Sequence, residues 1–273
     1  MSLPDLRWAA CQALLLCEPA AKVAATRSLW DARAHHGLDT TARLTPPRGV
    51  PLPGRPARPV CVPPQQVPLR SPFTLAGRAA LLHAIAHIEF NAINLALDAV
   101  WRYPDMPKAY YLEWLQVASE EALHFSLLQA HLASLGHGYG DFDAHSGLWD
   151  MAERTADDLT ARMALVPRIL EARGLDVTPG MQAKFGQAGD ARAVEILGII
   201  LRDEIGHVAV GNRWYRWCCA RDGLDPHSHG DRMARQHRAP KVRPPLNEPA
   251  RLAAGFTLEE LRAWTHDDSH RTA

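Results

Sequence analysis

Two Glu-x-x-His pairs are the residues of this chain whose types and spacing could do chemistry. They are Glu121 with His124 and Glu204 with His207. Residues three positions apart on an α-helix lie on the same side of it, so each pair can direct one carboxylate and one imidazole toward a single point. Oxygen-rich ligand sets with imidazole suit iron or manganese, whereas structural zinc sites prefer thiolate and histidine. Each pair is therefore a candidate half of a metal site.

A lone glutamate precedes each pair at nearly the same interval. Glu89 lies 32 residues before Glu121, and Glu171 lies 33 residues before Glu204. Placed on the helices of one bundle, this duplicated pattern supplies four carboxylates and two imidazoles, the ligand set of a dinuclear iron or manganese site. The predicted metal ligands are Glu89, Glu121, His124, Glu171, Glu204 and His207.

The same intervals predict that the glutamates lie level with each other across helix hairpins. Residues equally distant from a connecting turn reach the same height on two antiparallel helices. The midpoint of the first interval falls in Tyr103–Pro107 and that of the second in Gly186–Asp190, and both stretches are rich in helix breakers. The sequence therefore predicts one hairpin for each half of the site.

Apolar periodicity indicates which of the six residues point inward. At 100° per residue five of them fall in apolar stripes, whereas Glu171 lies about 100° from the stripe of its helix. Buried carboxylates normally neutralise, pair or bind a cation, which favours a metal. The alternatives are a metal-free network of Glu–His pairs that fixes helix register and, for Glu171, an ordinary place at a helix end.

The expected fold is all-α, because no stretch shows strand-like alternation of useful length. The core is expected to consist of four long helices, at roughly residues 74–102, 108–135, 148–187 and 190–220. The third of these must pass Gly174–Gly180, which cannot be regular helix. We expect an interruption there, beside Glu171, which either opens the core to a ligand or is a plain loop.

Three parts of the chain follow from composition. Residues 1–72 should form two short helices and a proline-rich connector, residues 73–221 a four-helix bundle, and residues 222–273 a C-terminal extension. The connector contains ten prolines between positions 44 and 72, too many for a helix or a central strand. The extension is polar and proline-rich, with a short helix expected near residues 257–264.

Overall composition limits the classes of partner. The 273 residues carry no net charge, which gives no general electrostatic case for nucleic acid or a membrane surface. The apolar run Trp8–Cys17 is too short to span a membrane. Five cysteines without a C-x-x-C pattern suggest neither a disulfide framework nor a thiolate zinc site, so a cytoplasmic location is expected.

Four further histidines are weaker candidates for a ligand role. His83 and His87, four residues apart, could bind a metal or haem, but they share a polar helix face, and a solvated or interdomain face is the simpler interpretation. His227 and His229 are expected in a surface loop.

The ligand pattern resembles the ferritin-like superfamily of carboxylate-bridged di-iron proteins. The resemblance covers about residues 74–220 and rests on Glu89, Glu121-Ala122-Leu123-His124, Glu171 and Glu204-Ile205-Gly206-His207. The flanking phrases at Glu89, Glu171 and Glu204 are similar to an uncharacterised bacterial ferritin-like family. The Glu-Ala-Arg stretch at Glu171 is also similar, over one helix, to di-iron hydroxylases that oxidise a modified adenosine in tRNA.

The resemblance implies two iron ions, with manganese or a mixed iron–manganese pair also compatible, and chemistry with O2. His124 and His207 would each bind one metal, and Glu121 with a lone glutamate would bridge. The implied function is an oxidase or hydroxylase that acts on a small molecule or modified nucleoside, with an unidentified electron donor. A ferroxidase or iron-handling protein is the alternative, although the extensions on both sides of the core argue against a ferritin cage.

A tRNA partner would require a basic surface. The C-terminal extension offers one strip of basic residues, Arg232, Arg235, Arg238, Lys241 and Arg243. Its simpler interpretation is a solvated tail.

Overall fold

The computed structural model describes residues 3–68 and 71–266, which divide into two compact units, Met1–Trp149 and Asp150–Ala273. All regular elements of the described residues are helical, apart from two isolated β-bridges, Asp5 with Gly37 and Cys61 with Ala144. The predicted all-α class is confirmed. A helix η2 (Pro64–Gln66) is the one helical turn of the described part of the proline-rich connector.

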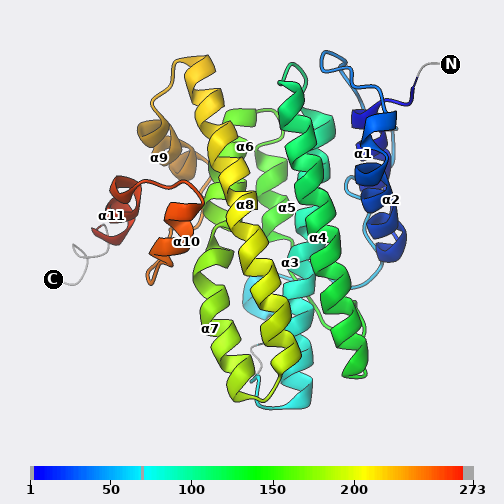
Figure 1. The fold of residues 1–273 in the computed structure, drawn as a ribbon, viewed down its shortest axis with the longest axis vertical. Coiled ribbons are helices and arrows are strands. Elements are labelled where there is room, and N and C mark those ends of the chain that lie inside the picture. Colours follow the sequence, from blue (N-terminus) through cyan, green and yellow to red (C-terminus); the bar gives the residue numbers. More distant parts are fainter. Residues whose placement is uncertain (1–2, 69–70, 267–273) are drawn as a thin grey trace. The chain divides into compact units, whose positions relative to one another are not determined.

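An antiparallel hairpin of α3 (Leu75–Arg102) and α4 (Lys108–Ser134) is the centre of unit 1 (Figure 1). Thr74 caps α3 by accepting a hydrogen bond from the amide of Gly77, and Pro107 immediately precedes α4. Between the helices, Asp105 adopts a positive φ of 62° that reverses the chain. The turn lies where the sequence intervals predicted it.

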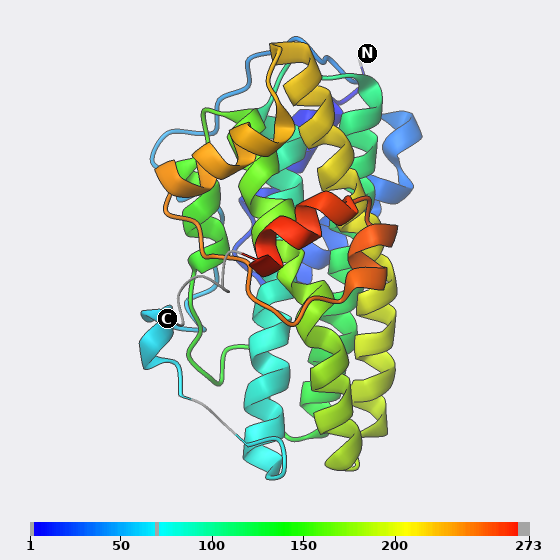
Figure 2. The same ribbon diagram turned by 90° about the vertical axis from the view of Figure 1, so that its left-hand side faces the viewer.

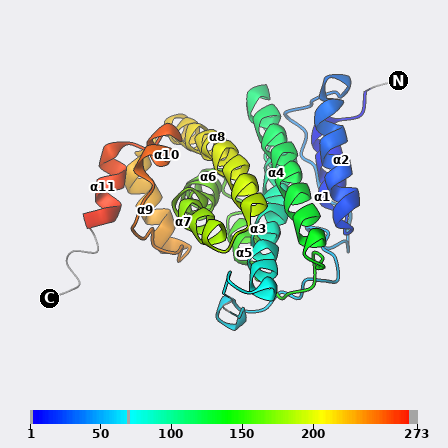
Figure 3. The same ribbon diagram turned by 60° about the horizontal axis from the view of Figure 1, so that its bottom comes forward.

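The two predicted N-terminal helices, α1 (Leu6–Leu14) and α2 (Pro19–Asp31), pack on α3 and α4 respectively (Figure 3). A 3-10 helix η1 (Arg33–His35) follows them. Arg7 of α1 is buried and donates hydrogen bonds to the carbonyls of Trp101, at 2.8 Å, and Asp39, at 3.0 Å. The two terminal nitrogens of this buried guanidinium bond backbone carbonyls, which fixes the N-terminal segment to the end of α3.

In unit 2 the third predicted helix is divided into several pieces. After α5 (Gly147–Arg154), which begins in unit 1, come α6 (Leu159–Leu165), a π-helix η3 (Val166–Glu171) and α7 (Arg173–Gln187). The fourth helix, α8 (Ala191–Asp222), runs antiparallel to α7 (Figures 1 and 2).

The predicted interruption at Gly174–Gly180 is wrong, because α7 runs through it. Pro179 cannot donate to the carbonyl of Leu175, which would normally leave that acceptor unsatisfied. Here Asn247 Nδ2 donates to it at 3.0 Å. The irregularity lies upstream instead, in η3, where the amide of Ala172 bonds the carbonyl of Pro167 five residues back at 3.0 Å.

The C-terminal extension holds more helix than its composition predicted. The expected short helix is α11 (Leu258–His266), but α9 (Pro226–Gln236) and α10 (Glu248–Ala253) were not expected. Each of these two helices has a polar N-cap followed by proline, Asp225-Pro226 for α9 and Asn247-Glu248-Pro249 for α10. Figure 2 shows the C-terminal helices lying against α6, α7 and α8.

An apolar cluster in unit 2 explains why α10 and α11 form. It joins residues of α7 and α8 to the last segment and consists of Ala172, Leu175, Val208, Ala250, Ala254, Phe256 and Leu261. At its edge, Arg251 makes a bidentate ion pair with Asp176 at 2.8 and 2.9 Å, and both side chains are fully buried.

Among the residues that the structure describes, one helix, α3, is long and apolar enough to cross a membrane by length and composition alone. However, 78% of its most apolar 18-residue window is buried inside the protein. Such burial is what a core helix shows.

Replacing Arg251 with methionine should destabilise the protein by about 3–5 kcal/mol, because the buried Asp176 would lose its bidentate cation and keep only the Asn247 amide at 3.0 Å and the more distant Arg173 at 3.6 Å. Urea unfolding of the wild type and the variant measures the difference. Arg192→Met is the matched control, since the Arg192–Glu195 pair is exposed and its loss should cost less than about 1 kcal/mol. Equal effects of the two substitutions would contradict this account of the C-terminal segment.

The buried Lys22 predicts that stability rises with pH above neutrality. Its ammonium donates to the carbonyl of Gly54 at 2.8 Å and to Asn94 Oδ1, and burial lowers its pKa to about 7. Between about pH 7 and the ordinary lysine pKa, the unfolded chain binds more protons than the folded chain. The free energy of unfolding therefore increases with pH across this window.

Urea unfolding at several pH values, compared with Lys22→Met, isolates this contribution. The wild type should gain about 1 kcal/mol per pH unit relative to the variant between pH 8 and 9.5. A difference that does not change with pH would show that Lys22 keeps its ordinary pKa.

Candidate metal centre

The first half-site, Glu89, Glu121 and His124, lies between α3 and α4. Glu89 projects from the middle of α3, and the other two residues project from α4. His124 Nδ1 lies 3.1 Å from Glu89 Oε2 and 3.3 Å from Glu121 Oε2. The three side chains offer ligand atoms that all lie within 4.8 Å of one another. The hairpin therefore brings Glu89 and Glu121 to the same height, as the sequence interval predicted, and His124 lies beside both.

Burial makes the negative charge of the two carboxylates in this half-site unfavourable unless it is compensated. Glu89 is 3% exposed, Glu121 is 2% exposed and His124 is completely buried. The aromatic rings of Phe90 and Phe125, residues adjacent in sequence to the site, pack against each other with centroids 5.2 Å apart. Two carboxylates in such surroundings require positive charge or protonation, and a bound cation supplies the charge. This buried Glu–His group could hold a metal ion.

The sequence predicts a second half-site from Glu171, Glu204 and His207, which all lie in unit 2. Glu204 and His207 lie on one side of α8, with His207 Nδ1 3.7 Å from Glu204 Oε1, and both are buried. Glu171 is the last residue of the π-helix η3 and is half-buried. Its intermediate exposure agrees with the boundary position that its periodicity indicated.

Close packing of η3 on α8 positions Glu171 within unit 2. A side chain at Gly211 could not be accommodated, because an added Cβ would lie 2.4 Å from Pro167 Cβ. Gly211 is four residues after His207 and therefore on the same face of α8. The π-helix thus approaches the histidine-bearing face at a point that only glycine permits. π-Helical turns of this kind recur at functional sites.

The donor chemistry of both half-sites fits a hard or borderline metal ion. Each offers carboxylate oxygens and one imidazole nitrogen, and none of the six residues is a cysteine. Iron and manganese accept this ligand set. The Asp203 carboxylate, next to the second half-site in sequence, lies 2.8 Å from Arg202 Nε.

The face that carries His83 and His87 is covered, contrary to the expected solvated or interdomain face. His87 Nδ1 lies 2.8 Å from the Tyr139 hydroxyl, and His83 Nε2 accepts a hydrogen bond from the amide of Gly140 at 2.9 Å. Burial lowers the pKa of each histidine to about 4, so both are neutral at physiological pH. They fix the segment 139–145 on α3.

His227 and His229 lie on α9 and not in a loop. His227 is exposed, whereas His229 is buried with Nδ1 3.2 Å from the Tyr215 hydroxyl. Sequence reasoning also missed Arg168, a buried residue of η3. Its only local signal was that it is the one charged residue in the run from Val166 to Leu170.

Fold and site together define an all-helical protein with a buried carboxylate–histidine group on a helix hairpin. Residues 15–262 match the family described as "Protein of unknown function (DUF455)", and the chain belongs to that family. A protein described as "Uncharacterized protein" from Haemophilus influenzae is 52% identical over 213 residues, which cover 76% of this chain and 74% of that protein. No solved structure gives a significant match.

Removing one carboxylate of the first half-site should abolish metal-dependent stabilisation. Ferrous iron, added anaerobically at about 100 times its dissociation constant, should stabilise the wild type by about 2.7 kcal/mol. Glu121→Gln should lose most of this gain, because a neutral amide is a poorer ligand. Metal-free Glu121→Gln should be at least as stable as metal-free wild type, since one buried charge is removed.

Glu120→Gln is the matched control, because Glu120 is the neighbouring residue on α4 and accepts a hydrogen bond from Gln116 on an exposed surface. Thermal melting with and without the metal measures both variants. An equal metal-dependent shift in wild type and Glu121→Gln would exclude this residue as a ligand.

Proposed function

We propose that this protein is a ferritin-like dinuclear metal protein that uses two iron ions for O2-dependent oxidation or hydroxylation. The observation that supports it best is the buried first half-site, where two carboxylates surround one imidazole. The duplicated sequence spacing supplies the second half. In this proposal the six predicted ligands together supply four carboxylates and two imidazoles to the two ions.

Each residue has a distinct role in the proposed centre. His124 binds one metal and His207 the other, which gives each ion one neutral imidazole. Glu121 and one lone glutamate would be shared by the two ions, and each remaining carboxylate would hold one ion. Four carboxylates then balance the four positive charges of two divalent ions, so the buried centre is neutral in its reduced state.

When bound, the two iron ions would supply the electrons that reduce O2. The chain itself holds the ligands in place and excludes bulk water around the first half-site, where His124 is completely buried. Glu171 at the end of η3 is the ligand with the least regular setting, because π-helical hydrogen bonding is less regular than that of the helices carrying the other five. We assign the substrate to small organic molecules or modified nucleosides, and the location to the cytoplasm.

Metal analysis tests the dinuclear centre. Protein expressed with supplied iron should contain about two iron ions per chain, and Glu89→Ala or His207→Ala should each contain markedly less. Glu195→Ala, an exposed position on α8, is the control and should retain the wild-type content. Fewer than one metal ion per chain in wild type, unchanged in these variants, would contradict the proposal.

Iron uptake distinguishes an oxidase or hydroxylase from an iron-handling protein. After anaerobic loading with ferrous iron and exposure to O2, the proposed enzyme should retain about two ferric ions per chain and stop there. Repeated additions of ferrous iron should then be oxidised no faster than in buffer. Continued rapid oxidation with accumulation of many iron ions per chain would favour the ferroxidase instead.

A further inference from the structure

We propose that unit 2 carries a second site, a basic pocket that binds a phosphorylated nucleoside with its phosphate near Arg235 and Lys241 and its ring near Trp264. The pocket is a cavity of about 710 Å³, within the range of small-molecule sites. It involves none of the six predicted metal ligands and does not depend on the proposed oxidation.

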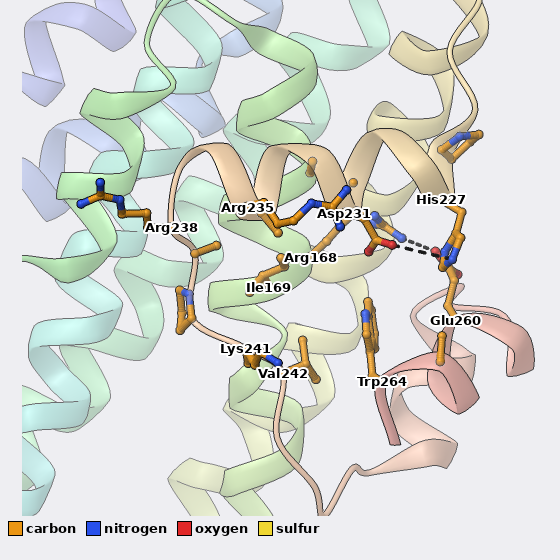
Figure 4. Close-up of a pocket in the computed structure, with 17 residues that line it drawn as sticks. Arg168, Ile169, His227, Asp231, Arg235, Arg238, Lys241, Val242, Glu260 and Trp264 are labelled. Carbon is orange, nitrogen blue, oxygen red and sulfur yellow. Dashed lines mark hydrogen bonds and ion pairs between the residues drawn. The ribbon is translucent and has the colours of Figure 1, made fainter. Parts of the chain in front are cut away.

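Four segments of unit 2 enclose this basic pocket (Figure 4). α9 forms one wall with Asp231 and Arg235, and the segment after it forms the next with Lys241 and Val242. α11 supplies Trp264, and the π-helix η3 closes the back. The pocket is therefore built largely by the C-terminal extension, whose composition alone suggested a solvated tail.

The charge of the lining favours an anion. The lining includes four cationic residues and two carboxylates, which gives it a net charge of two positive when His227 is neutral. The charged lining residues are Arg168, Arg235, Arg238, Lys241, Asp231 and Glu260. A concave surface of one sign concentrates the field and raises the local concentration of oppositely charged ligands.

Pairing at the back of the pocket engages Arg168 and Glu260 and leaves Arg235 of α9 as a cationic side chain available to an anion. Arg168 forms an ion pair with Glu260 and donates to Asn212 Oδ1 at 2.6 Å. Arg216 also approaches Glu260, at 3.4 Å, so the one carboxylate of α11 in the pocket is matched by two guanidinium groups. Within residues 3–68 and 71–266, no hydrogen bond or ion pair engages the guanidinium of Arg235, which is exposed.

The end of α9 holds a further arginine in an unusual backbone conformation. Arg238 has a φ of 51°, and the amide of Ala239 bonds the carbonyl of Ala234 at 2.9 Å, which is a helix termination that normally uses glycine. A positive φ is unfavourable for a residue with a side chain of this kind. In Figure 4 the Arg238 side chain is directed outward, so it contributes to the field at the rim and does not reach into the pocket.

Trp264 supplies a planar apolar surface within the same pocket. Its indole lies 5.3 Å from the Phe256 ring and 5.3 Å from the Arg251 guanidinium, and these contacts hold it in place. Figure 4 shows it between the Lys241 segment and Glu260. Stacking of a nucleobase on a protein aromatic ring adds affinity with any base, because every base has a π-face.

The basic side chains and the Trp264 indole together indicate which class of ligand fits the pocket. Arginine and lysine bind phosphate oxygens, and an indole binds a nucleobase ring, so a nucleotide satisfies both. Inorganic phosphate satisfies only the first feature and an unphosphorylated nucleoside only the second. The nucleotide could be free or the end of an RNA strand, since both present the same chemistry.

Calorimetric titration with AMP, inorganic phosphate and adenosine tests the site. AMP should bind more tightly than either fragment. Arg235→Ala and Lys241→Ala should each weaken AMP binding about tenfold, and Trp264→Leu should weaken AMP but leave phosphate binding unchanged. A purely structural effect of Trp264 would weaken both. Thermal melting of each variant verifies that it is folded, and Arg235 is exposed enough to be replaced without loss of the fold.

Arg232→Ala and Arg243→Ala are matched controls, because these arginines belong to the same basic strip but do not line the pocket. Both should bind AMP as the wild type does. Equal losses in all four basic variants, or no binding of AMP up to about 1 mM, would overturn the proposal. A short single-stranded RNA that binds with the same dependence on Arg235 supports an RNA end as the source, whereas RNA binding that ignores Arg235 would also overturn it.

Discussion

The burial of two carboxylates against His124 is the interaction on which the organisation of unit 1 depends. Carboxylates this deeply buried destabilise the protein unless a cation or a proton offsets their charge. Their donor atoms must also stay within a few ångströms of the imidazole, which requires α3 and α4 to keep a fixed register. The turn at Asp105 sets that register, and α1 and α2 hold it with two buried basic side chains, Arg7 and Lys22, that donate to backbone carbonyls.

Unit 2 also contains a helix hairpin, but its helices accommodate two prolines. Here α7 and α8 form the hairpin, but the chain before α7 contains Pro167 and α7 itself contains Pro179. The first is accommodated by π-helical bonding and by the absence of a side chain at Gly211, and the second by Asn247, which satisfies the orphaned carbonyl. The C-terminal segment therefore does more than cover the hairpin: it completes the hydrogen bonding of α7 and, by the same packing, forms the walls of the basic pocket.

The local sequence pattern was sufficient to predict the helices and turns that depend on neighbouring residues alone. The periodicity around Glu89 and Glu121 and the breakers at Tyr103–Pro107 predicted α3, α4 and their turn. Local pattern did not predict that α7 is continuous. The side chain that bonds the Leu175 carbonyl in place of Pro179 belongs to Asn247, 72 residues away in the chain, and no local window contains both. Local pattern failed similarly for His83 and His87, whose polar face is covered by a distant loop. The assignment of all six metal ligands stays a prediction.

Electron paramagnetic resonance of the iron-loaded, fully oxidised protein tests the central claim most directly. If carboxylates from the two half-sites bridge two ferric ions, the spins couple and the pair gives no signal, although chemical analysis finds about two iron ions per chain. One-electron reduction should then produce the signal of a mixed-valence pair. A signal of isolated high-spin ferric ions that accounts for all the bound iron would contradict a dinuclear centre.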